Sequence, residues 1–166
     1  MKYLIHFSGM PGTGKTTTSL ELKRIIKHSV VISRNSVKEW FNDFKNNNLE
    51  EKLIYAILIK STDIFLSHDY SVIVDGAGWS KEFYNKFKKI AQKNNARLVS
   101  IRLNCKTKTS IKRTSSRKKE YVWDRERLEN FKNIFEEIPI DISINSEKNN
   151  PNKILRIICK KIKLKS

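Results

Sequence analysis

A glycine-rich turn directly after an apolar run constrains the fold of this chain more than any other feature. The run reads YLIHFS (3–8) and the turn reads GMPGTGKT (9–16), which fits the pattern G-x-x-x-x-G-K-[ST] without a mismatch. This pattern makes physical sense only between a strand and a helix. The apolar run supplies the strand, and residues 15–28 carry apolar side chains at helical spacing. The octet therefore predicts a strand, a sharp turn and a helix, in that order.

The turn has the composition of an anion-binding site. Its glycines let successive backbone N–H groups point inward, and the following helix directs its positive end to the same place. Lys15 would reach the β- and γ-phosphates of a nucleoside triphosphate, and the Thr16 hydroxyl would join the shell of a Mg²⁺ ion. A glycine-rich turn without a ligand is the alternative, which the flanking strand and helix disfavour. ATP is the expected cofactor, and its predicted binding residues are Gly9, Pro11, Gly12, Thr13, Gly14, Lys15, Thr16 and Thr17.

The rest of the chain alternates between short apolar segments and helical patterns. Strands are predicted at 3–8, 29–33, 71–75, 97–103 and 141–145, and helices at 15–28, 37–44, 51–66, after Ser80, from about Thr107, at 124–135 and from Asn150-Pro151. This alternation predicts an α/β fold, with a five-stranded parallel sheet covered by helices on both faces. Ligands of such sheets bind beyond the carboxyl ends of the strands. The length of 166 residues fits one domain spanning residues 1–166.

Asp75 ends the segment SVIVD (71–75), the clearest buried strand of the sequence. A carboxylate at the carboxyl end of a strand can hold a metal-bound water beside a phosphate-binding turn. Apolar strands that end in Asp are also common before ordinary turns. Because the turn at 9–16 is present, we predict that Asp75 and Thr16 form a Mg²⁺ site and that Asp75 takes part in catalysis.

The chain is strongly basic, with 34 Lys and Arg against 17 Asp and Glu and a formal net charge of +17. Such an excess favours a polyanionic partner, so we predict RNA or DNA binding, although a Lys- and Asn-rich composition can also reflect an AT-biased genome. Residues 106–119 contain seven bases and no acid. Arg113 and Arg117 share one face of a helix there, and arginine forks match phosphate oxygens. This segment predicts a basic lid over about 106–124, with a solvated basic helix or a plain RNA-binding face as the alternative.

No apolar stretch approaches the roughly 18 residues of a membrane span, and the start of the chain has too short an apolar run for a signal peptide. Cys105 and Cys159 lie far apart and form no metal-binding pattern, as expected for thiols in a reducing compartment. These features predict a cytoplasmic protein.

Four segments together resemble a known family, the polynucleotide-kinase-like P-loop phosphotransferases of phages and their relatives. They are GMPGTGKTT (9–17), VVISRNSVKEW (30–40), VIVDGAGWSKEF (72–83) and SIKRTSSRKK (110–119), and the likeness extends to about residue 135. The resemblance implies a three-layer P-loop kinase fold with a small helical lid. It also implies transfer of the γ-phosphate of ATP to a nucleic-acid hydroxyl, with a 5′-hydroxyl end as the leading acceptor. Arg34, Asn35 and Lys38 would contact the acceptor, and the implied catalytic residues are Lys15, Asp75, Arg113 and Arg117.

The sequence departs from this family at one position. Where the family has Arg followed by Asp, this chain has Arg34-Asn35, and Asn cannot accept the proton of the acceptor hydroxyl. Three explanations remain open. Asp75, Glu39 or Asp43 serves as the base, or loose phosphoryl transfer needs little help from a base, or the protein binds a nucleotide and transfers nothing. A small-molecule or nucleotide kinase and an inactive nucleotide- and RNA-binding module are therefore the competing hypotheses.

Overall fold

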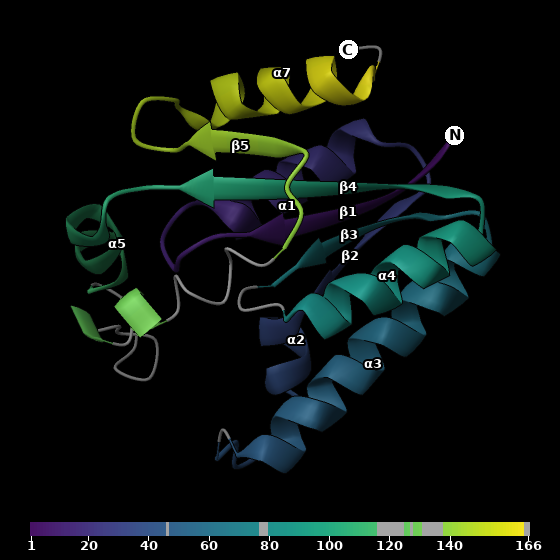
Figure 1. Cartoon of the computed structure of the whole chain (residues 1–166), viewed down its shortest axis with the longest axis horizontal. Coiled ribbons are helices and arrows are strands. Elements are labelled where there is room, and N and C mark those ends of the chain that lie inside the picture. The colour runs from purple at the N-terminus through teal and green to yellow at the C-terminus, as the bar shows by residue number, and fades with distance from the viewer. Residues whose placement is uncertain (46, 77–79, 116–124, 127, 131–137, 165–166) are drawn as a thin grey trace.

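A computed structural model describes residues 1–45, 47–76, 80–115, 125–126, 128–130 and 138–164. Its centre is one five-stranded sheet in the order β2-β3-β1-β4-β5, and every neighbouring pair of strands is parallel (Figure 1). This sheet confirms the predicted α/β class. The strands are β1 Lys2–Ser8, β2 Ser29–Ser33, β3 Ser71–Asp75, β4 Ala96–Asn104 and β5 Ile142–Asn145.

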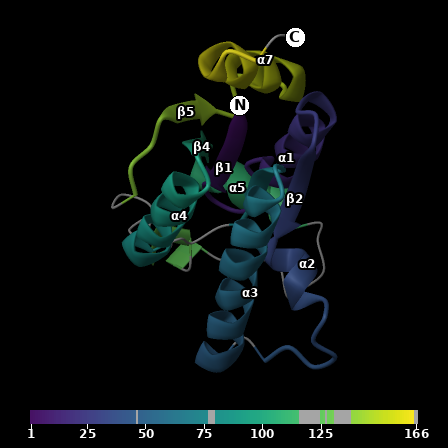
Figure 2. The ribbon, with the colours of Figure 1, turned by 90° about the vertical axis from the view of Figure 1, so that its right-hand side faces the viewer.

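Helices cover both faces of the sheet and form two separate cores. α1 and α7 pack on one face, and α3 and α4 pack on the other (Figures 1 and 2). The helices are α1 Lys15–Ile25, α2 Arg34–Lys38, α3 Asn48–Ser67, α4 Lys81–Lys93, α5 Thr107–Thr114 and α7 Pro151–Ile162. Within the described part of the chain, no helix combines the length and the apolarity needed to cross a membrane.

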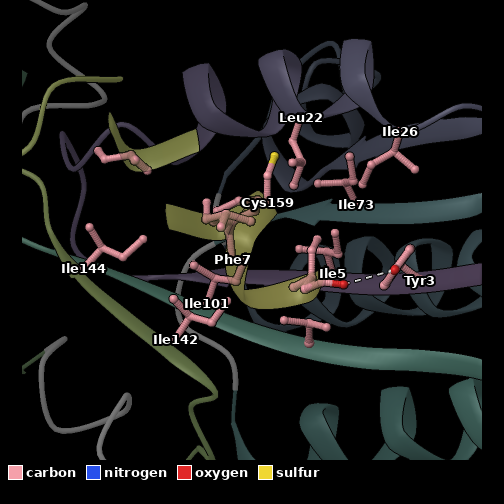
Figure 3. Close-up of a cluster of buried hydrophobic side chains, with 14 of the residues drawn as sticks. Tyr3, Ile5, Phe7, Leu22, Ile26, Ile73, Ile101, Ile142, Ile144 and Cys159 are labelled. Atoms are coloured by element: carbon pink, nitrogen blue, oxygen red, sulfur yellow. Dashed lines mark hydrogen bonds between the residues drawn. The ribbon is translucent and has the colours of Figure 1, made fainter. Parts of the chain in front are cut away.

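The core under α1 and α7 joins the two ends of the chain. Figure 3 shows part of this cluster, in which Phe7 of β1, Leu22 of α1 and Cys159 of α7 are buried together. The Tyr3 hydroxyl donates a hydrogen bond to the Ile162 carbonyl oxygen at 3.2 Å, so the last turn of α7 is tied to β1. This packing fixes α1, and with it the turn that precedes α1.

Side-chain caps determine where several helices begin. The Ser80 hydroxyl accepts from the Phe83 N–H, and the Asn150 side chain accepts from the Lys153 N–H ahead of α7. Asn47 and Glu50 form a reciprocal capping box at the start of α3. The predicted starts of the helices after Ser80 and Asn150 are thus confirmed.

The predicted helix at 37–44 is wrong in its bounds. α2 begins at Arg34, because the Ser33 hydroxyl accepts the Asn35 N–H and caps the helix three residues early. After Lys38 the chain tightens into turns, with the Trp40 N–H bonded to the Val37 carbonyl. Most of the predicted helix at 124–135, and the predicted lid beyond residue 115, lie outside the described residues.

His6 illustrates what burial in this sheet does to a titratable group. It lies inside β1, its ring stacks on Phe87 with the centroids 6.2 Å apart, and its Nδ1 is 3.3 Å from the Ser100 hydroxyl. Burial lowers the pKa of His6 from 6.5 to about 3, so the ring is neutral in the folded protein.

The acid limb of the stability curve should therefore depend on His6. Below about pH 6.5 the His6 ring binds a proton in the unfolded chain but not in the folded protein. The free energy of unfolding therefore falls as the pH drops towards 3. Between pH 7 and 4.5 the protonation of His6 in the unfolded chain lowers the free energy of unfolding by about 2.5 kcal/mol. In His6→Asn, the loss of unfolding free energy over this range should be smaller than in the wild type by that amount, as measured by urea unfolding. Equal losses in the two proteins would contradict this account of His6.

Candidate functional site

The predicted site residues gather at the carboxyl edge of the sheet. Residues 9–14 connect the end of β1 to the start of α1. In the strand register Asp75 lies opposite Phe7 of β1 on one side and Ser33 of β2 on the other. The turn, the end of β3 and the start of α2 are thus neighbours, as the parallel sheet predicts.

The glycines of the turn occupy backbone conformations that other residues rarely adopt. The φ angles of Gly9, Gly12 and Gly14 are +131°, +75° and +92°. Gly9 also passes close to β4, since a Cβ placed on it would lie only 2.1 Å from the Leu103 carbonyl oxygen. The glycines therefore set both the path of the turn and its distance from the sheet.

Lys15 lies inside the turn and does not point to solvent. Its side chain is 9% exposed, and its Nζ donates to the carbonyl oxygens of Gly9 at 2.7 Å and Met10 at 2.8 Å. The Thr13 hydroxyl braces the same loop by donating to the Met10 carbonyl at 2.8 Å. The ammonium group thus sits at the centre of the loop that the motif assigns to phosphates.

Thr16 and Asp75 are hydrogen-bonded through their side chains, which brings the two predicted metal ligands together. Asp75 is 4% exposed and is the only carboxylate that the structure describes as buried. Burial raises the pKa of Asp75, whereas the Thr16 hydroxyl bonded to it and the nearby Lys15 ammonium lower it.

These two oxygen ligands fit Mg²⁺, which usually binds through one or two protein oxygens, with phosphates and waters completing an octahedron. Among the described residues, no group of three or more His, Cys, Asp or Glu could hold a metal ion by itself. A metal ion at Thr16 and Asp75 would therefore depend on the phosphates of a nucleotide.

α5 packs directly against the turn. The Ser110 hydroxyl donates to the Pro11 carbonyl at 2.7 Å, and Arg113 donates to the Gly12 carbonyl at 3.2 Å. Arg113 also contacts the Ser146 hydroxyl and carbonyl, both at 3.3 Å, in the loop after β5. The structure thus brings Arg113 beside the turn, where it links two loops, while Arg117 lies outside the described residues.

On the acceptor side, the structure gives Arg34 a partner that the sequence did not indicate. Its guanidinium pairs with both carboxylate oxygens of Glu51, one contact being Nε to Oε2 at 3.2 Å. Arg34 also hydrogen-bonds Tyr55, whose ring lies 4.2 Å from that of Phe83. Burial raises the pKa of Tyr55, and the Arg34 charge partly opposes this.

The other predicted acceptor residues lie on the α2 surface. Asn35 is exposed, and the Lys38 ammonium lies 4.7 Å from the centre of the Phe44 ring. The alternative bases Glu39 and Asp43 are both exposed, and Asp43 pairs with Lys45 at 3.6 Å. Asp75 is thus the one proposed base that is buried beside the turn.

A family model described as "Chromatin associated protein KTI12" matches residues 2–146. The chain belongs to the KTI12 family. This match covers the turn, Asp75, α5 and the whole sheet. A comparison with curated proteins found no significant match.

Solved structures confirm the P-loop kinase fold. Kti12 from Chaetomium thermophilum, in complex with ADP-AlF3, aligns with a TM-score of 0.65 and 18% identity over 96% of this chain and 98% of that one. An unliganded sugar kinase from a Janibacter species gives 0.73 and 11% identity over 99% and 96%. The Mycobacterium tuberculosis APS kinase CysC, in complex with AMPPNP and APS, gives 0.72 and 9% over 98% and 98%. The resemblance to kinases therefore holds for the fold, and polynucleotide-kinase specificity remains a prediction.

Three residues that contact the site were not predicted from the sequence: Glu51, Ser110 and Ser146. Ser110 lies inside the basic segment at 106–119, whose charge pattern points to the arginines and not to a serine. Glu51 and Ser146 meet their arginine partners across 17 and 33 residues of chain. A single sequence carries no signal that links positions so far apart.

Proposed function

We propose that this chain is a Mg²⁺–ATP-dependent phosphotransferase whose acceptor is a hydroxyl group of a nucleic acid, most readily a 5′-hydroxyl end. The observation that carries the proposal is the convergence of Lys15, Thr16 and buried Asp75 on one glycine turn. The P-loop kinase fold supports it, as does the nucleotide or analogue bound by two of the similar structures. The domain spanning residues 1–166, with its lid, belongs to the same proposal.

Each residue of the turn has a defined task in this scheme. The backbone N–H groups of the turn and Lys15 would bind the β- and γ-phosphates, with the ammonium exchanging the Gly9 and Met10 carbonyls for phosphate oxygens. Thr16 and Asp75 would hold Mg²⁺, which when bound neutralises charge on the phosphates. Arg113 keeps α5 against the turn and lies where it can approach the nucleotide.

Transfer forms a bond between the acceptor oxygen and the γ-phosphorus and breaks the bond from that phosphorus to the β,γ-bridging oxygen. The acceptor hydroxyl loses its proton in the process. Asp75 is the proposed base, because it is the one candidate buried beside the turn. Its carboxylate would take the proton through the oxygen that does not bind Mg²⁺. Positioning supplies most of the remaining rate in loose phosphoryl transfer.

The charge of the protein favours a nucleic acid over a small acceptor. A net charge of +17 exceeds what one bound triphosphate requires, and α5 adds exposed Lys108 and Lys112 close to the turn. Exposed cations of this kind attract a phosphodiester backbone over a long range.

Transfer of label from γ-labelled ATP tests the proposal. Oligoribonucleotides and oligodeoxynucleotides with a 5′-hydroxyl are incubated with Mg²⁺, beside the same oligonucleotides carrying a 5′-phosphate and beside free nucleosides. Label should enter the 5′-hydroxyl oligonucleotides alone. Label confined to nucleosides would instead establish a small-molecule kinase.

A nucleotide-binding module without transfer activity is the second candidate, and the exposed Asn35 favours it. Asn35→Asp introduces the carboxylate that the resembling family has, and a general base contributes about 10²–10⁴-fold. If both the wild type and Asn35→Asp transfer label, the proposed phosphotransferase activity is supported. If only the variant does, or if neither does while ATP binding is intact, the wild-type protein is such a module.

A further inference from the structure

α7 carries a straight row of bases on its outer side. Lys153, Arg156, Lys160 and Lys163 are exposed and follow one another at steps of three, four and three residues. Lys153, Arg156 and Lys160 lie on one face of the helix, over about 10 Å of its axis, and Lys163 is the C-cap residue just beyond its end. α7 has no acidic residue, and its opposite face is buried in the core by Ile154, Ile158 and Ile162. The row therefore faces solvent as a continuous positive stripe.

α1 lies beside α7 and extends the same surface (Figure 2). Its outer side adds exposed Lys23 and Arg24, with Lys27 just beyond its end, and its one acid, Glu21, pairs with Arg24. No other base of this surface forms an ion pair with any residue that the structure describes. We call it the α1/α7 face, and its bases are Lys23, Arg24, Lys27, Lys153, Arg156, Lys160, Lys161 and Lys163.

The opposite layer, formed by α3 and α4, has a different charge pattern. Its bases are accompanied by four acids, two of which form ion pairs: Lys86 with Glu82 at 2.6 Å, one turn apart on α4, and Lys93 of α4 with Asp63 of α3 at 2.8 Å. The acids of this layer are Glu50, Glu51, Asp63 and Glu82. A general excess of lysine in the composition would give both layers a similar net positive charge. The α1/α7 face instead has a net charge of +7, from eight bases and Glu21, against +3 for the α3/α4 layer, from seven bases and four acids.

We propose that the α1/α7 face is a docking surface for the phosphodiester backbone of a nucleic acid. Exposed lysines and arginines without acidic partners bind phosphates through charge and read no base sequence. Both helices begin at the carboxyl edge of the sheet, and α1 starts at Lys15 itself, so a strand held here runs towards the site. The inference rests on the nucleic-acid acceptor of the proposed function and adds where that acceptor is held.

A matched pair of triple variants tests the surface. Lys153→Gln, Arg156→Gln and Lys160→Gln together remove three charges from the stripe. Lys81→Gln, Lys88→Gln and Lys89→Gln remove three exposed charges from α4, none of them in an ion pair with a described residue. Both variants change the net charge equally, so the long-range field falls alike. Gln keeps the helix propensity close to that of Lys and Arg, and circular dichroism with a melting curve checks the fold.

Fluorescence anisotropy with 20-nucleotide RNA and DNA, titrated with salt, gives the readout. The stripe variant should bind at least about tenfold more weakly at about 50 mM salt, and its log–log salt slope should fall by about 2, as for three lost contacts to a single strand. The α4 variant should lose less than about threefold. Equal losses in the two variants, or none in the stripe variant, would overturn the docking surface.

The same proteins separate this inference from the proposed function. A dinucleotide acceptor is too short to span the stripe, so the stripe variant should phosphorylate it at the wild-type rate while its KM for the 20-nucleotide acceptor rises. If the wild-type protein transfers phosphate and the stripe variant has the same KM for the 20-nucleotide acceptor, the docking surface is refuted and the proposed function is not. Wild-type protein that neither binds nor labels oligonucleotides refutes both proposals. Binding to vesicles that contain anionic lipid is measured for the same proteins. If the stripe variant lost vesicle binding but kept its affinity for nucleic acid, the face would be a membrane-binding surface and the proposal would be overturned.

Discussion

Gly9→Ala is expected to lower the free energy of unfolding by at least about 3 kcal/mol. The φ of +131° is unfavourable for any L side chain, and the new Cβ would lie 2.1 Å from the Leu103 carbonyl oxygen. That oxygen belongs to the backbone of β4, which pairs with β1 up to Arg102 and with β5 at Leu103, so it cannot move away alone. Relief of the clash therefore requires β1 and β4 to separate where the turn begins.

Gly14→Ala is the matched control for this prediction. Gly14 also has a positive φ, +92°, but nothing lies within 4 Å of the position of its Cβ. This variant should lose only the cost of backbone strain, about 1–2 kcal/mol. Urea unfolding with equal m-values gives both numbers. Equal losses at the two glycines would mean that backbone conformation, and not the approach of β1 to β4, explains the requirement for Gly9.

The success of the sequence predictions follows from local physics. The glycine motif, the β-branched run at 71–75 and the capping residues Ser80 and Asn150 act over a few residues, and the structure places a turn, a strand and two helix starts at these positions. The edge that carries the site was predictable too, because parallel strands bring their carboxyl ends together. Thr16 and Asp75 meet there as a consequence of topology.

The contacts that could not be predicted from the sequence are those between side chains of different helices, strands and loops. Arg34 is predicted from the sequence to contact the acceptor, yet its guanidinium is held by Glu51, because α3 returns past the start of α2. The start of α2 differs from the prediction for a smaller reason, since the Ser33 hydroxyl caps the helix three residues ahead of the apolar pattern of 37–44. Both outcomes depend on distances that only the folded chain defines. An acceptor phosphate at Arg34 would have to share or displace Glu51.

Lys15→Met is expected to lower transfer at least 1,000-fold, about 4 kcal/mol of transition-state stabilisation. The ammonium is the charge that the turn brings to the β- and γ-phosphates, and Met keeps the length of the side chain while removing that charge. Stability should respond in a different way. A cation that is 9% exposed is costly to bury, and its bonds to the Gly9 and Met10 carbonyls offset much of this cost. The unfolding free energy should therefore change by less than about 1 kcal/mol.

This contrast distinguishes a ligand-binding lysine from a structural one. Isothermal titration with ATP and urea unfolding are measured on Lys15→Met, with the exposed Lys60→Met of α3 as the control that removes the same charge far from the turn. If Lys15→Met bound and used ATP like the wild type but unfolded more easily, the ammonium would serve only to hold the loop carbonyls together. The backbone N–H groups of the turn would then bind the phosphates without the Lys15 ammonium. Loss of ATP binding at unchanged stability would instead show that the fold positions a buried charge for its ligand.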